Sequence, residues 1–290
     1  MLNAMTVDVE EHFQVSAFDA AVSREDWGSM PSRVRVNTER VLDLLDEAGV
    51  RATFFVLGWV AERKPDLVRA IAGRGHEIAS HGYSHRRVYQ QRPDEFRNEA
   101  VRSRKFLQDV SGQPVTGYRA ASFSIGSGNL WALDILADAG FSYDSSLFPV
   151  VHDLYGIPGA PRRIHRLRTA AGRELIEVPP STVRLGFATA AVAGGGYLRI
   201  LPAVVTRWAI RRLNRGERMP AVVYVHPWEL DPDQPRIPAP LKSRLRHYSR
   251  IRTTEGKLRD LLRRFRFATL SEVIAREGAS ALPVHRVAAT

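Results

Sequence analysis

The amino-acid sequence predicts an α/β fold with a parallel sheet or barrel, because strand-like and helix-like segments alternate along it. Short apolar runs rich in β-branched and aromatic residues indicate buried strands, and the stretches between them carry apolar residues at helical spacing. Polar residues directly follow several of these runs. In parallel α/β proteins the active site forms at the carboxyl ends of the strands, so this placement indicates a functional site at one rim.

The first half of the chain contains most of the predicted elements. Gly49 and Gly73 each follow a helical pattern, as expected for glycines that end helices. The predicted elements are a strand at 4–7, a helix at 38–48, a strand at 52–57, a helix at 65–72, a strand at 77–80, a helix at 93–110, a strand end at 116–119, a helix at 130–139 and a strand at 141–143.

Residues 150–200 interrupt this alternation with several prolines and the run Gly194-Gly195-Gly196. We expect loops, a hairpin around 170–172 and an insertion that faces the substrate. The three glycines lack the Lys-Ser/Thr of a phosphate-binding loop, so they predict a flexible turn.

The alternation then returns, and we expect one domain over 1–277, of which 227–277 is a C-terminal extension, followed by a flexible tail. The remaining predicted segments are a helix at 201–213, a strand at 221–225, helices at 253–264 and 271–276, a strand at 267–269 and the tail at 278–290.

Composition limits the possible classes of protein. The 290 residues are 44% hydrophobic, enough for one large core, and no apolar run approaches the ~20 residues of a membrane span. The chain has no cysteine, which excludes disulfides, thiolate metal sites and a cysteine nucleophile. The N-terminus lacks the pattern of a signal peptide, so we expect a cytoplasmic protein.

The net charge of +11 comes from 42 basic and 31 acidic residues, with much of the excess after about residue 160. Such a surface allows peripheral association with a membrane or an anionic glycan, but the charge pattern favours a solvated arginine-rich face. The sequence has no zinc finger, RNA-binding aromatic signature or helix-turn-helix pattern, so no nucleic-acid partner is expected.

The segment from His81 to His85 is the strongest indication of chemistry. Two imidazoles four positions apart can reach one ion, and a carboxylate from the distant Asp8-Val9-Glu10 segment can complete three ligands. Three protein ligands leave a position open for water, as in hydrolytic metal centres. Ordinary loop histidines are the alternative.

Strand alternation separates the acidic residues at the end of the first strand. Asp8 and Glu10 are expected on one face of the strand, with Val9 and Glu11 on the other. Glu10 is therefore the predicted metal ligand and Glu11 a bystander. His12 shares the parity of Glu10, but it lies where the strand is expected to end, which favours a structural role.

Three more polar residues follow predicted strands and are candidates for the same rim. Arg119, Asp144 and His226 each follow such a run closely. Arg119 could instead be a salt-bridge partner, and Asp144 could cap a turn. Convergence with the metal-binding segments favours a shared active site.

Five ordered segments span residues 6–228. They are Thr6-Val7-Asp8-Val9-Glu10, Ser80-His81-Gly82-Tyr83-Ser84-His85, Tyr118-Arg119-Ala120-Ala121-Ser122, Tyr143-Asp144-Ser145-Ser146 and Tyr224-Val225-His226-Pro227. Together they resemble the motifs of the polysaccharide deacetylase family, also called carbohydrate esterase family 4. The region from Trp228 to Tyr248 is also similar to the subgroup found beside exosortase-linked (PEP-CTERM) exopolysaccharide loci.

This resemblance implies a distorted (β/α) barrel of about seven parallel strands with an inserted loop and hairpin region. It implies metal-dependent removal of N-acetyl groups from an N-acetylated polysaccharide or oligosaccharide. The cofactor would be one divalent ion, Zn²⁺ or else Co²⁺, Mn²⁺ or Ni²⁺, held by His81 and His85 together with Glu10.

The resemblance also implies roles for the other site residues. Asp8 would be the general base and Arg119 would orient it. His226 would be the general acid, and Asp144 would tune it.

The chain departs from the family pattern at two positions. The commoner first motif has two adjacent aspartates, whereas Val9 follows Asp8 here, so the ligand role moves to Glu10. Ala121 stands where the third motif usually has proline, which would stiffen the loop that presents a backbone N–H to the oxyanion.

Three functions therefore remain open from the sequence. The first is an N-deacetylase of an exopolysaccharide pathway. The second is a deformylase or amidohydrolase that acts on a lipid-linked sugar or a small amide at the same metal centre. The third is a non-catalytic glycan-binding homologue.

Overall fold

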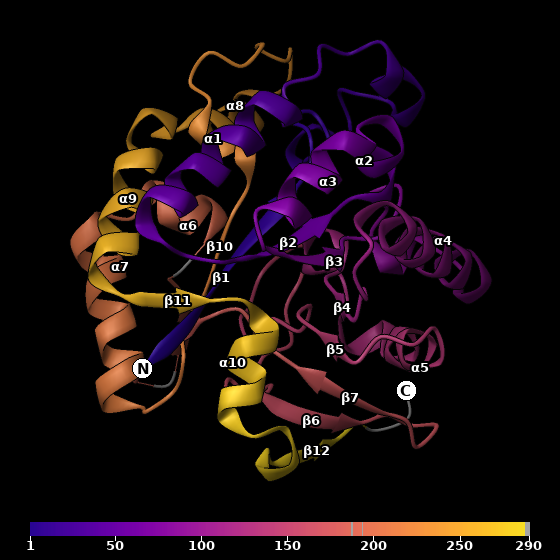
Figure 1. Ribbon diagram of the computed structural model, residues 1–290, viewed down its shortest axis with the longest axis vertical. Coiled ribbons are helices and arrows are strands. Elements are labelled where there is room, and N and C mark those ends of the chain that lie inside the picture. The colour runs from indigo at the N-terminus through magenta and orange to yellow at the C-terminus, as the bar shows by residue number, and fades with distance from the viewer. Residues whose placement is uncertain (187, 193, 288–290) are drawn as a thin grey trace.

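The computed structural model describes residues 1–186, 188–192 and 194–287 (Figure 1). Within this part of the chain, the main sheet has the strand order β10-β1-β2-β3-β4-β5-β7-β6-β12, and β11 also pairs with β1. Its strands are β1 (Leu2–Val9), β2 (Thr53–Val56), β3 (Glu77–Ser80), β4 (Gly117–Tyr118), β5 (Tyr143–Asp144), β6 (His165–Arg168), β7 (Glu174–Glu177), β10 (Val222–Val225), β11 (Arg266–Ala268) and β12 (Val284–Arg286).

The seven strands from β10 to β7 in this order run parallel, which confirms the predicted α/β class. Helices surround the sheet in Figure 1. They are α1 (Val34–Ala48), α2 (Gly58–Arg63), α3 (Pro65–Gly73), α4 (Pro93–Ser111), α5 (Trp131–Asp138), α6 (Gly195–Ile200), α7 (Ala203–Arg211), α8 (Leu241–Tyr248), α9 (Thr254–Arg264) and α10 (Leu270–Glu277).

The central strands are buried on both faces, and alternate residues pack into different clusters. Val7 and Phe54 belong to the large core shared with helices α1 to α5. Ala4 and Phe55 belong to a smaller cluster on the other face, which α10 covers. Asp8 has the parity of Ala4 and lies beside Phe55 in the register of β1 and β2, so its side chain leaves the sheet on the inner face.

Helix α1 begins at Val34, four residues before the predicted start at Thr38. The Glu11 carboxylate explains this earlier start. It accepts hydrogen bonds from the backbone N–H groups of Arg33 (2.9 Å) and Val34 (3.1 Å) and from the Ser32 hydroxyl (2.5 Å). Because the cap comes from a distant segment, the local pattern did not reveal it.

The predicted hairpin around 170–172 is confirmed, since β6 and β7 pair antiparallel. A second antiparallel pair, β8 (Thr182–Leu185) with β9 (Ala188–Ala191), was not predicted.

The flexible turn expected at the three glycines is wrong, because Gly195 and Gly196 begin α6. A Cβ on Gly194 would lie 2.0 Å from the Tyr224 ring, so close packing explains that glycine.

The predicted flexible tail is also wrong in part. Val284–Arg286 form β12, which pairs in parallel with the outer side of β6 and so continues the sheet at its edge. Residues 288–290 lie outside the described residues. Among the residues that the structure describes, no helix has the length and apolar character needed to cross a membrane.

Candidate active site and metal centre

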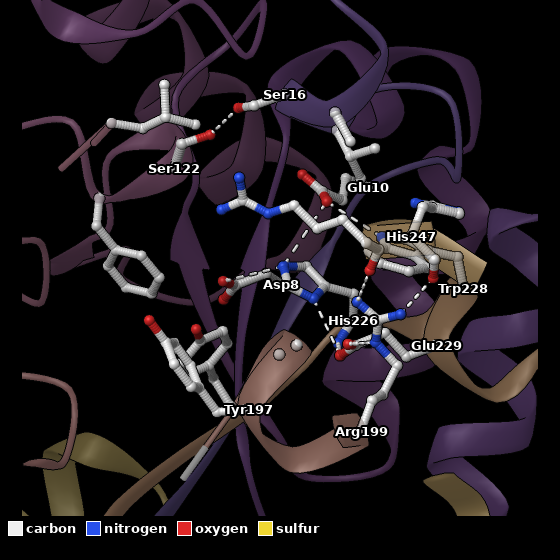
Figure 2. A pocket seen from close by; sticks show the side chains of 18 of the residues that line it. Asp8, Glu10, Ser16, Ser122, Tyr197, Arg199, His226, Trp228, Glu229 and His247 are labelled. Atoms are coloured by element: carbon white, nitrogen blue, oxygen red, sulfur yellow. Dashed lines mark hydrogen bonds and ion pairs between the residues drawn. The ribbon is translucent and has the colours of Figure 1, made fainter. Parts of the chain in front are cut away.

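The carboxyl ends of the parallel strands surround a cavity of about 410 Å³ (Figure 2). Asp8 is at the end of β1, His81 directly follows β3, and His226 directly follows β10. The strand order brings these distant segments to one rim, as the alternation of strands and helices predicts.

The predicted metal ligands lie together at this rim. Glu10, His81 and His85 each offer one ligand atom, and the three atoms lie within 4.8 Å of one another. The His85 Nε2 is 2.7 Å from the Glu10 Oε2, and the His81 Nε2 is 3.9 Å from the same oxygen. The His81 Nδ1 is 2.9 Å from the Arg119 carbonyl oxygen, which leaves the His81 Nε2 directed to the site.

The surroundings of these three groups favour a bound cation. All three side chains are buried, and the Glu10 Oε2 faces both imidazoles. Burial lowers the pKa of His81 to about 4, so this imidazole is neutral at pH 7, as a ligand must be. Burial alone would raise the pKa of Glu10, but His85 and then His226 lower it well below its usual range. Two imidazole nitrogens and an ionised carboxylate oxygen are a suitable set of ligands for Zn²⁺.

Arg119 lies against Asp8, as the resemblance implies. The fully buried guanidinium donates to the Asp8 Oδ1 (2.6 Å) and to the Thr6 hydroxyl (2.9 Å). It also donates to the Ser145 hydroxyl (2.9 Å) and lies 4.1 Å from the centre of the Phe55 ring. These contacts fix one oxygen of Asp8, while its Oδ2 is 3.9 Å from the His226 Nε2.

The expected pairing of Asp144 with His226 is wrong. The Asp144 carboxylate accepts instead from the Ser146 hydroxyl (2.6 Å) and the Ser146 backbone N–H (3.2 Å). The Ser146 hydroxyl oxygen accepts from the Ala120 backbone N–H (2.8 Å), so Asp144 supports the segment after β4. Burial raises the pKa of Asp144 to about 6, and burial beside Asp144 raises the pKa of Glu177 well above its usual range.

Glu229 takes the place expected for Asp144. It lies in the 3₁₀ turn η7 (Pro227–Leu230), and its Oε2 is 3.1 Å from the His226 Nδ1 and accepts from the His226 backbone N–H (2.9 Å). Burial alone would lower the pKa of His226, but Glu229 and then Glu10 raise it to about 9. At neutral pH these carboxylates therefore keep His226 protonated.

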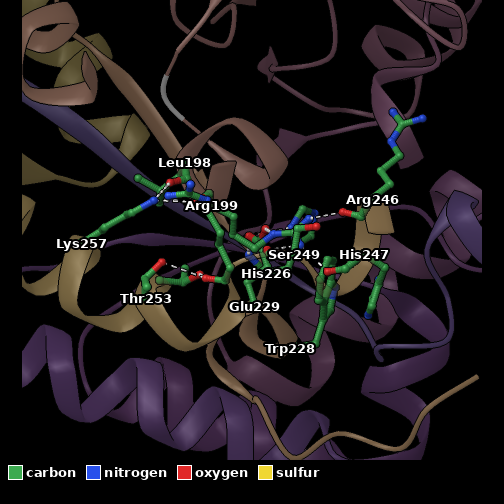
Figure 3. A network of polar contacts seen from close by, with 12 residues as sticks. Leu198, Arg199, His226, Trp228, Glu229, Arg246, His247, Ser249, Thr253 and Lys257 are labelled. Carbon is green, nitrogen blue, oxygen red and sulfur yellow. Dashed lines mark hydrogen bonds and ion pairs between the residues drawn. The ribbon is translucent and has the colours of Figure 1, made fainter. Parts of the chain in front are cut away.

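Arg199 fixes Glu229 from the opposite side (Figure 3). The Arg199 Nε donates to the Glu229 Oε1 (2.6 Å), and both side chains are buried. The Lys257 ammonium donates to the Arg199 carbonyl oxygen (2.6 Å) and the Leu201 carbonyl oxygen (2.8 Å). His226, Glu229 and Arg199 therefore form an ordered network. Glu229 lies only three residues after His226, so sequence spacing alone could have identified it.

The segment after Arg119 has an unusual backbone. Ser122 (φ 52°) and Phe123 (φ 52°) are consecutive non-glycine residues in the left-handed region, which costs about 1–2 kcal/mol each. The Ser122 hydroxyl contacts the Ser16 hydroxyl at the edge of the cavity, which both residues line (Figure 2). Within the described chain the Ser122 backbone N–H has no hydrogen-bond acceptor. Backbone strain in the wall of a cavity is typical of functional sites. A backbone N–H without an acceptor at such a place can stabilise an oxyanion that forms during a reaction.

His12, which sequence parity left as a candidate, does not line the cavity. Its side chain is fully buried, and its ring packs edge-on against Phe13 at 5.2 Å. This placement agrees with the structural role that the sequence favoured.

Family models match both halves of the chain. The polysaccharide deacetylase model matches residues 15–143, and a model named as a domain of unknown function (DUF3473) matches residues 145–275.

Known proteins match shorter stretches. A peptidoglycan-N-acetylglucosamine deacetylase of Bacillus cereus is 40% identical over 75 residues, which are 26% of this chain and 27% of that protein. A chitooligosaccharide deacetylase of Bradyrhizobium sp. is 31% identical over 100 residues, or 34% of this chain and 43% of that protein. This chain therefore spans less than half the length of these two relatives.

A solved structure of a Mycobacterium smegmatis protein assigned to the polysaccharide deacetylases superposes over the whole chain. It has a TM-score of 0.64 and 25% identity, and the match covers 100% of this chain and 93% of that one. The family model, the relatives and this full-length likeness therefore show that the chain is similar to polysaccharide deacetylases.

Proposed function

We propose that the protein is a metal-dependent N-deacetylase that removes acetyl groups from an amino-sugar glycan. One observation carries the proposal: a candidate base and acid, Asp8 and His226, meet a three-ligand metal site in a single buried pocket. The His226 Nε2 is 3.9 Å from the Asp8 Oδ2 and 3.7 Å from the Glu10 Oε1. Amide hydrolysis at a metal centre with a separate base and acid needs the metal, the base and the acid close together.

The metal ligands in this proposal are Glu10, His81 and His85. A divalent ion held by them would polarise the amide carbonyl and lower the pKa of a nearby water. The buried Glu10 Oε2 supports this assignment, because it lies within ligand reach of the nitrogens of both histidines.

Asp8 is the proposed general base. Arg119 holds its Oδ1, so the Oδ2 remains directed to the cavity and can take a proton from water. The Ser122 backbone N–H is the proposed donor to the oxygen that gains negative charge as the amide carbon becomes tetrahedral. No nucleophilic side chain is needed for this route.

His226 is the proposed general acid. The amine leaves as a neutral group only after its nitrogen gains a proton, and protonated His226 can supply that proton. Glu229 keeps the imidazolium in place and protonated, and Arg199 in turn holds Glu229.

We also propose that the substrate belongs to an exopolysaccharide pathway. The similarity of the Trp228 to Tyr248 region to proteins of exopolysaccharide loci supports this step. The two relatives are named for peptidoglycan and chitooligosaccharide, which are both N-acetylated glycans. A cavity of about 410 Å³ lies in the usual range for a small-ligand site and supports binding of one part of a glycan chain.

Peripheral contact with an anionic membrane or glycan is a separate part of the proposal. Val204 and Trp208 lie one turn apart on α7 and are 59% and 42% exposed, and Arg207 and Arg211 are on the same helix. Cosedimentation with anionic and neutral vesicles tests this contact. Equal recovery of the protein with both vesicle types, or with neither, would argue against it.

The central experiment measures acetate release from N-acetylglucosamine oligomers by metal-free protein and by protein reloaded with Zn²⁺, Co²⁺, Mn²⁺ or Ni²⁺. The proposal expects release only after reloading, and almost none from Asp8→Asn. Formate release from N-formylated analogues, without acetate release, would indicate a deformylase. Bound metal with neither product across the glycan panel would indicate a binding module.

A further inference from the structure

We propose that Trp228 is a positioning residue of the metal centre. Its indole N–H holds one oxygen of Glu10, so that the other oxygen faces His81 and His85. This inference rests on the metal site of the proposed function, and Trp228 lies outside the five segments that resemble the family motifs.

The two oxygens of Glu10 have different neighbours. The Trp228 Nε1 donates to Oε1 at 3.2 Å, and the His226 Nε2 lies 3.7 Å from the same oxygen. Oε2 lies 2.7 Å from the His85 Nε2 and 3.9 Å from the His81 Nε2, so it faces the two other predicted ligands. The geometry therefore assigns Oε1 to the indole and Oε2 to the cation.

This chain needs such support more than a chain with adjacent aspartates does. Asp8 and Val9 lie within β1, whose pairing with β2 fixes the backbone, whereas Glu10 lies just beyond the strand. Glutamate also has one more rotatable bond than aspartate, so its carboxylate can adopt more positions. A directional donor on one oxygen removes part of this freedom and orients the carboxylate before the cation binds.

The indole ring is well placed to act as a fixed donor. Trp228 is 4% exposed, stacks on His247 at 4.1 Å with an interplanar angle of 16°, and stacks on His226 at 5.1 Å and 22°. The His247 Nε2 is 2.7 Å from the Gln234 Oε1, which fixes the ring under the indole. The Arg199 guanidinium lies 5.1 Å from the Trp228 ring centre. Figure 3 shows these side chains packed together.

The chemistry of the indole agrees with this role. An indole N–H can only donate, so it cannot compete with Glu10 for a cation as a carboxylate, imidazole or hydroxyl neighbour could. Loss of a group that orients a metal ligand typically weakens metal affinity about 10- to 100-fold.

The test uses Trp228→Phe, which keeps a flat aromatic ring and removes the N–H. Zn²⁺ affinity of the metal-free full-length protein is measured by competition with a chromophoric chelator. We expect Trp228→Phe to bind Zn²⁺ about 10- to 100-fold more weakly than the wild type. Trp131→Phe is the control, because Trp131 is partly buried on α5, packs at 5.7 Å on Phe96 and does not line the cavity. It should bind Zn²⁺ as the wild type does.

A double-mutant cycle with Glu10→Ala separates orientation of Glu10 from a general packing effect. If Trp228 acts through Glu10, adding Trp228→Phe to Glu10→Ala should change the Zn²⁺ affinity little. Wild-type affinity in Trp228→Phe would overturn the inference, and so would an equal loss of affinity with and without Glu10.

The readout also separates this inference from the proposed function. A wild type that binds Zn²⁺ but releases no acetate would contradict only the function. Active Trp228→Phe with unchanged Zn²⁺ affinity would contradict only the inference. A wild type that binds no divalent ion would contradict both. Thermal melting of the metal-free variants checks that each is folded.

Discussion

At the scale of single residues, the three acidic side chains near the end of β1 differ because their neighbours differ. Asp8 is paired with Arg119, Glu10 faces His81 and His85, and Glu11 caps α1. Alternation along a strand is enough to separate Glu10 from Glu11 in the sequence, because the side-chain period of two is a backbone property. The individual roles then follow from contacts made by distant segments.

The first prediction separates the base from the ligand. Asp8→Asn should keep its metal and lose ~10²–10⁴-fold in turnover, the range for a general base. Glu10→Gln should weaken metal binding itself, because an amide oxygen is a poorer ligand than a carboxylate. Elemental analysis and acetate release on both variants provide the measurement. The assignment of the two residues is reversed if Asp8→Asn loses the metal while Glu10→Gln keeps it.

The second prediction concerns the histidine ligands. His81→Ala and His85→Ala should each lose most of the bound metal, because two remaining ligands give a much weaker site. His76→Ala is the control, since His76 is buried but lies outside the cavity, with its Nδ1 accepting from the Ala52 backbone N–H (3.2 Å). Full metal content in both ligand variants, measured by elemental analysis, would remove the proposed centre.

The third prediction concerns the pH dependence that Glu229 confers on His226. A general acid acts in its protonated form, so the rate should fall as the pH rises through the pKa of His226. Glu229 raises that pKa, which is about 9 in the folded protein. Glu229→Gln removes the negative charge, lowers the pKa of His226 and should move the basic limb of the pH–rate profile to lower pH.

Asp144→Asn is the comparison for this profile. Asp144 makes its hydrogen bonds to Ser146 and not to His226, so its replacement should leave the basic limb in place. If the basic limb of the pH–rate profile moves in Asp144→Asn and stays in place in Glu229→Gln, then Asp144 is the partner of His226, as the motifs imply. The sequence could not reveal the true pairing through strand parity, because Glu229 lies in a 3₁₀ turn where that parity does not apply.

At the scale of elements, local patterns predicted the regular helices and strands, and contacts between distant segments set the exceptions. Helix α4 (Pro93–Ser111) ends one residue after the predicted end at Val110. Gly112, with φ 68°, caps it. By contrast, the start of α1 depends on Glu11, and β12 forms because β6 offers a free edge. Neither partner is near in sequence, so neither feature could be predicted from local composition.

The fourth prediction concerns the short segment η4 (Ala121–Phe123), where proline is usual in the family. Ala120 has φ −70° and ψ 140°, the conformation that a following proline favours. Within the described residues the Ala121 N–H has no acceptor, so proline removes no hydrogen bond. Ala121→Pro should therefore stabilise the protein by about 0.4–1 kcal/mol and keep acetate release.

Ala120→Pro is the matched control in urea unfolding. The Ala120 N–H donates to the Ser146 hydroxyl at 2.8 Å, and proline would abolish this bond. The control should lose stability while Ala121→Pro gains it. Destabilisation of both variants by similar amounts would show that the segment does not accept proline at either position.

At the scale of the whole molecule, the two family-model regions share one sheet. Residues 15–143 and 145–275 match different models, yet β1 pairs with β2 from the first region and with β10 and β11 from the second. The proposed acid His226 comes from the second region, and the proposed ligands come from the N-terminal part. The site therefore depends on both regions being folded together.

The last prediction follows from this shared sheet. Residues 1–144 alone would leave β1 without its neighbours β10 and β11, and the large core would lose Val223 and Val225. Exposed strand edges and a partial core are unfavourable, so this fragment should show no cooperative urea transition.

The full chain should unfold with coincident tryptophan-fluorescence and far-UV circular-dichroism curves, as one domain over 1–277 requires. Removal of residues 284–290 is the control, because β12 is the one helix or strand that it deletes among the described residues, and it should leave the transition cooperative. An independently folding 1–144 fragment, or two separate transitions in the full chain, would instead indicate two domains.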